Sequence, residues 1–202
     1  MEARPPVAKK KRCPERFEAA RENLRRCRAA AREGRIGLFY LDECGFANLP
    51  NVQRSWSPKG QPHEAEAGVS RQRVNVVGAL DYATGQLWHD VHDTTVRREN
   101  VVSLIERIAR REDRKPLTLV VLDNATMHHG IAPETREDWR VNHRLVLLYL
   151  PPYSPELNLI EILWKHAKYH WRRFVTWAKD QVREEAVKLM QGFGSAYKIS
   201  FA

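Results

Sequence analysis

Three short apolar runs constrain the fold of this chain more than any other feature. All three are rich in strand-forming residues, and they are 36–41 (IGLFYL), 117–122 (LTLVVL) and 145–150 (LVLLYL). The run 117–122 contains no charge, which is typical of a central parallel strand. The run 145–150 is too brief for a helix and is ended by two prolines. It therefore predicts another strand, covered on both faces.

The segments between these runs predict two further strands and two helices. Val74–Asp81 and Gln86–Thr95 flank a turn that ends in Gly85 and predict a hairpin. Arg97–Arg111 carries apolar residues on one helical face, and Pro133–His143 also predicts a helix. Strands and helices in this order predict an α/β fold, a mixed five-stranded sheet flanked by helices.

A long amphipathic helix is expected after the last strand. Ser154 is a good N-cap, and Pro155 fits the first helical position. Apolar residues then recur at helical spacing, namely Leu157, Ile160, Trp164, Ala167, Trp171, Phe174 and Ala178. Glu156 falls in the first turn, where the helix dipole stabilises a carboxylate by about 0.3–1 kcal/mol. Glu161 lies deeper and flanks the buried stripe, so it either pairs with Lys165 at the surface or faces a site.

Acidic residues stand at three comparable places in this order of elements. Asp42 directly follows the first strand, Asp123 follows the fourth, and Glu161 lies on the helix after the fifth. Taken singly, each aspartate has an alternative role in a turn or cap. Converging carboxylates raise one another's pKa unless a cation compensates, and oxygen ligands suit Mg²⁺ or Mn²⁺. Two such ions can activate an attacking oxygen and stabilise a leaving one, which predicts metal-dependent phosphoryl transfer.

Positive charge is concentrated at the N-terminus. Residues 1–35 hold 12 Lys and Arg against 5 Glu, a balance of +7 out of the net +9 of the chain. The run Lys9, Lys10, Lys11 and Arg12 therefore predicts a DNA contact, with a solvated tail as the alternative. Glu15–Arg32 predicts a helix with a thin apolar stripe, which docks on a neighbour, lies along nucleic acid, or connects to another part.

Cysteine usage and hydropathy set the compartment. The three cysteines are widely spaced and contain no CxxC pair, so neither a disulfide framework nor a thiolate zinc site is indicated. The chain contains no apolar run long enough to span a bilayer and no signal-like segment. We therefore expect a soluble protein in a reducing compartment. In the Pro- and Gly-rich connection 44–73, Trp56 and Lys59 are candidates for DNA contacts or for loop packing.

Five sequence blocks resemble one known family. They are YLDECGF (40–46), SWSPKGQ (55–61), VVGALD (76–81), VLDNATMHH (121–129) and LPPYSPELNLIEILW (150–164). Together they resemble the catalytic domain of the DDE transposases of the mariner superfamily, particularly its bacterial insertion-sequence branch. The resemblance spans residues 36–170 and implies a ribonuclease H-like fold. It divides the chain into a basic segment, 1–35, and a catalytic domain, 36–202. Where the family usually has proline, this chain has Leu159, which should extend the helix through that segment.

The resemblance also implies the site and its partners. Asp42, Asp123 and Glu161 would form the metal-binding and catalytic triad for two Mg²⁺ or Mn²⁺ ions, with Asn124 and His128 lining the site. The partners would be double-stranded DNA at transposon ends and targets, a second copy of the chain in the DNA complex, and an upstream helix-turn-helix product. Thirty-five residues are too few for that recognition domain, so the chain resembles a second reading frame, a truncated copy, or half of a frameshift fusion. Its place would be the bacterial cytoplasm, at the nucleoid.

Three alternatives remain open at this point. A non-catalytic remnant or regulator would keep the fold and bind DNA or transposase subunits without cutting. A resolvase or ribonuclease of the same fold would share the metal site but would not account for the block 150–164. His166 and His170, at i and i+4, could instead bind zinc, although no third ligand is in view and core or DNA-facing roles are favoured.

Overall fold

The structure of the protein is a computed structural model, and it is described here for residues 13–48, 58–61, 73–113, 115–170, 178–197 and 199. Its centre is a five-stranded sheet with the order β3-β2-β1-β4-β5. The strands are β1 (Gly37–Ala47), β2 (Arg73–Asp81), β3 (Leu87–His92), β4 (Thr118–Leu122) and β5 (Leu145–Tyr149). All five predicted strands are therefore confirmed, and so is the mixed α/β architecture.

Strand β1 lies in the middle of the sheet and pairs differently with its two neighbours. It pairs antiparallel with β2 from Phe39 to Ala47, but parallel with β4 only from Gly37 to Tyr40. The expectation that this strand ends at Leu41 is wrong, because pairing with β2 carries it six residues further. Asp42 therefore lies within the strand, just beyond the point where β1 and β4 cease to pair.

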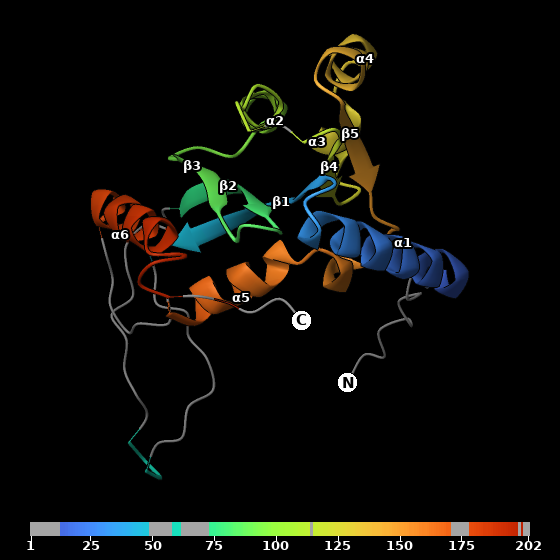
Figure 1. Ribbon diagram of the computed structural model, residues 1–202. Coiled ribbons are helices and arrows are strands. Elements are labelled where there is room, and N and C mark those ends of the chain that lie inside the picture. The colour runs from blue at the N-terminus through green and yellow to red at the C-terminus, as the bar shows by residue number, and fades with distance from the viewer. Residues whose placement is uncertain are drawn as a thin grey trace, which may run out of the picture.

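Helices cover both faces of the sheet (Figure 1). They are α1 (Pro14–Arg32), α2 (Arg98–Ala109), α3 (Thr126–His129), α4 (Pro133–Asn142), α5 (Ile160–His170) and α6 (Lys179–Gln191). Successive side chains of β1 point to opposite faces of the sheet, so the hydrophobic core consists of two clusters. Leu38 and Tyr40 join the cluster beneath α1, α5 and α6, whereas Phe39 and Leu41 join the cluster beneath α2 and α4. Among the described residues, no helix is long and apolar enough to cross a membrane.

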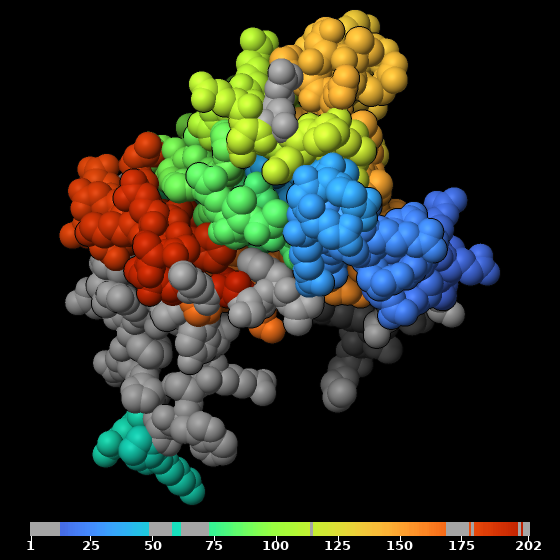
Figure 2. All heavy atoms as spheres, viewed as in Figure 1, coloured from blue at the N-terminus to red at the C-terminus, as the bar shows by residue number. Residues whose placement is uncertain are grey.

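The first helix docks on this core. Phe17, Leu24 and Ala31 are buried in the same cluster as the α5 side of the sheet. Arg28 Nε donates a hydrogen bond of 2.8 Å to the Tyr40 hydroxyl on β1. Figure 2 shows the side chains of α1, in blue, lying against the folded body. Of the three roles considered for this helix, docking on a neighbour is therefore the one that the structure shows.

The predicted long helix from Ser154 is wrong. Residues Pro155–Leu157 form one 3₁₀ turn, Asn158 is extended (φ −91°, ψ 102°), and α5 begins only at Ile160. The expectation that Leu159 would extend the helix fails for the same reason. Asn158 is 2% exposed, and its Nδ2 donates a hydrogen bond of 3.0 Å to the carbonyl oxygen of Leu41. This tertiary bond fixes Asn158 outside the helix, against its local helical pattern.

Two smaller expectations also need correction. β5 is an edge strand rather than a strand covered on both faces, since Val146 is 37% exposed. The one-turn helix α3, directly after Asp123, has too few residues to show a helical period and was not predicted. Both features lie beside the acidic residues and help to shape their surroundings.

Candidate active site

One cavity of about 410 Å³ brings the three predicted acids together. Asp42 reaches it from β1, Asp123 from the end of β4, and Glu161 from the first turn of α5. The wall between them is the loop after β5, with Leu150, Pro151, Pro152, Tyr153, Ser154 and Pro155. Residues separated by more than a hundred positions therefore converge where β1 and β4 diverge.

Asp42 is the acid whose ionisation is most hindered. It lies on the α5 face of β1, opposite Gly78 of β2, and is partly buried. Burial raises the pKa of Asp42 to about 8, and the negative charge of Glu161 adds to this rise. A proton or another cation is therefore favoured at this carboxylate near neutral pH.

Asp123 is shifted in the opposite direction. Its Oδ1 accepts hydrogen bonds from the amide of Ala125 (2.9 Å) and from Nδ1 of His128 (2.8 Å). The hydrogen bond from His128 is the main cause that lowers the pKa of Asp123. Both bonds end on Oδ1, and Asp123 lines the cavity. Asp123 thus stays ionised where Asp42 tends to keep its proton.

The resemblance implied that His128 lines the site. In the structure, His128 lies behind the site instead. Its side chain is 0% exposed, between Asp123 on one side and Glu43 Oε1 at 2.9 Å from Nε2 on the other. Burial by itself would lower the pKa of His128, but the hydrogen bonds to Asp123 and Glu43 together raise it to about 10. Both ring nitrogens face carboxylate oxygens, so the ring is an imidazolium that donates from each.

Asn124 lines the cavity and ties the ends of two strands together. Its Nδ2 donates to the carbonyl oxygen of Leu150, and its Oδ1 lies 2.8 Å from Nε2 of His129. The His129 ring stacks on Tyr149 of β5 with centroids 4.6 Å apart. The side chain of Asn124 is therefore held by two partners where it lines the cavity, and its role there stays a prediction.

Glu161 sits in a different local setting from the one expected. Because α5 begins at Ile160, Glu161 lies in its first turn, near the positive end of the helix dipole, and is exposed. Among the described side chains there is no ion pair between Glu161 and Lys165, so the surface-pair alternative is not supported. Glu156, by contrast, lies on the 3₁₀ turn and does not line the cavity.

The other predicted contacts lie elsewhere. Lys59 is exposed and is not part of the cavity, while Trp56 and the run 9–12 fall outside the described residues. His166 stacks on Tyr197, with ring centroids 5.1 Å apart. Within the described part of the chain, no three His, Cys, Asp or Glu side chains stand close enough to hold one ion. A zinc site at His166 therefore has no support. The three acids lie near one another, but they are too far apart to bind one ion together.

Sequence reasoning missed two residues that shape the site. Glu43 reaches His128 from the face of β1 opposite Asp42, and Asn158 anchors the start of α5 on Leu41. The pair Asp42-Glu43 was a signal, because adjacent strand residues face opposite sides and Glu43 therefore needs a partner of its own. Asn158 lies within the block 150–164, but nothing in that block indicated its bond to Leu41.

Comparison with known proteins adds a family and a fold. Residues 37–182 match the family described as DDE superfamily endonuclease. The chain is 26% identical over 128 residues to the insertion element IS630 uncharacterized 39 kDa protein of Shigella sonnei. This match covers 63% of this chain and 36% of that protein.

Solved structures of similar fold include the Mos1 mariner paired end complex with Mn (TM-score 0.61, 14% identity) and the Mos1 strand transfer complex (0.59, 15%). Each match covers 95% of this chain, and 59% and 57% of the respective Mos1 chain. The chain thus spans little more than a third of its curated relative and somewhat over half of these structural neighbours.

Proposed function

Since the chain belongs to the DDE superfamily endonuclease family, we propose that it is the catalytic part of a transposase that cuts DNA at transposon ends and joins the freed 3′ hydroxyls to target DNA. The observation that carries the proposal is the convergence of Asp42, Asp123 and Glu161 on one cavity. Three carboxylates with these surroundings suit phosphoryl transfer at a divalent cation better than proton transfer to a small molecule.

The donor set fits a hard divalent ion. The three acids offer only oxygen ligands, and burial together with the negative charge of Glu161 raises the pKa of Asp42 to about 8, which a bound cation would offset. We therefore propose that two ions, Mg²⁺ or Mn²⁺, would be held by Asp42, Asp123 and Glu161. When bound, such ions lower the pKa of an attacking oxygen and stabilise the charge on the leaving one.

The residues of the chain prepare the site for that chemistry. His128 keeps Asp123 ionised and holds its Oδ1, so that a ligand oxygen is ready without loss of a proton. Burial keeps the pKa of Asp42 near 8, so a cation held there would compete with a proton for this carboxylate. Asn124 fixes the β4–β5 end of the cavity. Tyr153, at the rim, is 55% exposed and therefore available to a bound nucleic acid.

DNA and a second copy of the chain are the proposed partners. The structural neighbours are described as Mos1 paired end and strand transfer complexes, which supports DNA ends as the substrate. The excess of positive charge in residues 1–35 supports binding to a polyanion. A helix-turn-helix partner, encoded upstream, would supply recognition of the transposon ends. These partners place the chain in the bacterial cytoplasm.

The test compares the two glutamates of the β5–α5 segment. Glu161→Gln keeps the shape of the side chain and removes a charge from the cavity, so Mn²⁺-dependent nicking of a pre-nicked DNA end should fall by orders of magnitude. Glu156→Gln, outside the cavity, should leave nicking nearly intact and cost at most about 1 kcal/mol of stability. Loss of nicking in Glu156→Gln alone would refute the assignment of the triad. No cleavage by the wild type with any metal would favour a non-catalytic DNA-binding role.

A further inference from the structure

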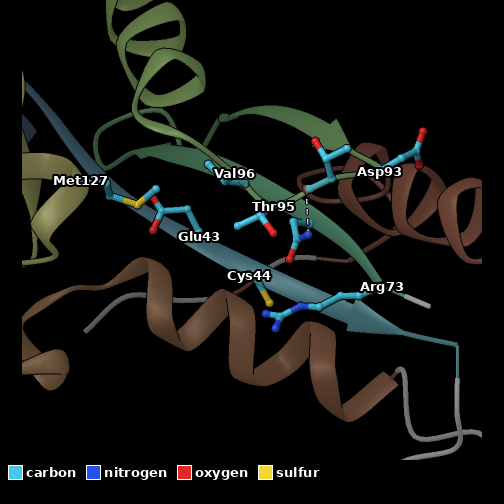
Figure 3. A pocket seen from close by; sticks show the side chains of 9 residues that line it. Glu43, Cys44, Arg73, Asp93, Thr95, Val96 and Met127 are labelled. Carbon is cyan, nitrogen blue, oxygen red and sulfur yellow. Dashed lines mark hydrogen bonds between the residues drawn. The ribbon is translucent and has the colours of Figure 1, made fainter. Parts of the chain in front are cut away.

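A buried link joins the two faces of the sheet behind the cavity. Asp42 and Glu43 are neighbours on β1, so their side chains point to opposite faces. Glu43 projects into a separate groove of about 580 Å³, which is lined by residues of β1, β2, the segment before α2, and α3. In Figure 3 its carboxylate lies beside Met127, at the end of the groove away from Asp93.

His128 connects this groove to the cavity. Its Nε2 lies 2.9 Å from Glu43 Oε1, and its Nδ1 lies 2.8 Å from Asp123 Oδ1. The imidazole is fully enclosed and is held at both ring nitrogens by carboxylate oxygens. A ring held at both nitrogens cannot rotate without breaking two charge-assisted hydrogen bonds.

The orientation of Asp123 depends on this ring. Asp123 follows the last residue of β4, outside the strand ladder, and its side chain is 52% exposed. The bonds from His128 and Ala125 both hold Oδ1 and leave Oδ2 to other partners, while Asp123 lines the cavity. We propose that Glu43 is a positioning residue for Asp123: through His128 it fixes which carboxylate oxygen is presented to a divalent cation. This inference rests on the proposed metal-dependent function.

The position of Glu43 makes the proposal testable without unfolding the protein. Its side chain is 20% exposed and borders an open groove, so removing it leaves no closed void in the core. Glutamine can still hydrogen-bond Nε2 of the ring, because its amide carries both a donor and an acceptor. Alanine cannot. A positioning role therefore predicts that glutamine restores most of what alanine loses.

The experiment measures Mn²⁺ affinity by isothermal titration calorimetry on the whole chain. Outer partners of metal ligands contribute about 10–100-fold in affinity, so Glu43→Ala should weaken Mn²⁺ binding by about 10-fold or more, and Glu43→Gln should stay within about threefold of the wild type. Asp93→Asn is the matched control, because Asp93 borders the same groove but pairs with Arg183 at 3.2 Å. Its Mn²⁺ affinity should be unchanged.

A double-mutant cycle tests whether Glu43 acts through His128. In a His128→Ala background, Glu43→Ala should cause no further loss of Mn²⁺ affinity. Circular dichroism of each variant verifies that the fold is kept. Wild-type affinity in Glu43→Ala, or an equal additional loss in the His128→Ala background, would overturn this inference alone. A wild-type chain that binds no Mn²⁺ would overturn the proposed function and the inference together.

Discussion

The partly buried carboxyl of Asp42 should make the metal-free protein less stable as the pH rises. Its pKa lies near 8 in the folded protein, against an ordinary value of 3.8, because of burial first and Glu161 second. Because the pKa of Asp42 is raised in the folded state, its protonated carboxyl stabilises the fold fully below pH 3.8. This contribution to the free energy of unfolding is lost as the pH rises through 8. At about 1.4 kcal/mol per pH unit, the limit of this loss is about 5–6 kcal/mol.

Asp42→Asn removes the ionisation and keeps the shape. Rearrangement and water entry relieve part of the strain in the wild type, so we expect the variant to be more stable by at least about 2 kcal/mol at pH 9. At pH 4, where the carboxyl is already neutral, the two proteins should be nearly equal in stability. The sign of this difference is opposite to that of most substitutions in a protein interior.

Urea denaturation at pH 4, 7 and 9, in the presence of EDTA, measures the free energy of unfolding of both proteins. Glu156→Gln serves as the control for removal of an acid outside the cavity. Adding Mn²⁺ at pH 7 should stabilise the wild type and leave Asp42→Asn nearly unchanged, because a bound cation replaces the proton. A stability difference between Asp42→Asn and the wild type that does not vary with pH would refute the reasoning.

Two further substitutions test how the sheet holds its helices. A Cβ on Gly78 would lie 2.8 Å from Cη2 of Trp164, so Gly78→Ala should displace α5. The free energy of unfolding, measured by urea denaturation, should fall by about 1–3 kcal/mol, and Mn²⁺-dependent nicking should fall as well. Unchanged stability would contradict this packing. Leu24→Ala should cost about 2–5 kcal/mol, because Leu24 is 1% exposed within the core; a cost below about 1 kcal/mol would show that α1 is not part of the folded unit.

The strands and the convergence of the acids were predictable because they follow from local patterns. Short apolar runs of this length, bounded by turn residues, favour strands, and acids after parallel strands meet at one edge of the sheet. The full extent of β1 was not predictable from the same signal. Residues 42–45 are polar or small, and only pairing with β2, at least thirty residues away, keeps them in a strand.

The helix break before α5 and the Glu43–His128 bond were not predictable, because both depend on contacts between residues far apart in the sequence. Asn158 bonds to a carbonyl 117 residues earlier in the chain, and His128 lies 85 residues from Glu43. No period or cap in the sequence encodes such contacts, because they arise only after the sheet has brought distant segments together. The same fact explains why Glu161 was placed too deep in its helix: the start of α5 is set by a tertiary bond, not by Ser154 and Pro155.

The brief parallel pairing of β1 with β4 has a consequence for motion. Asp42 lies inside a ladder that continues on its β2 side, so its backbone moves only if the centre of the sheet opens. Asp123 lies beyond the last paired residue of β4, and hydrogen bonds to its side chain from His128 and Ala125 set its place instead of strand pairing. Asp123 can therefore move when those hydrogen bonds break, while the sheet stays folded. Strand pairing fixes one side of the cavity, and hydrogen bonds to a side chain fix the other.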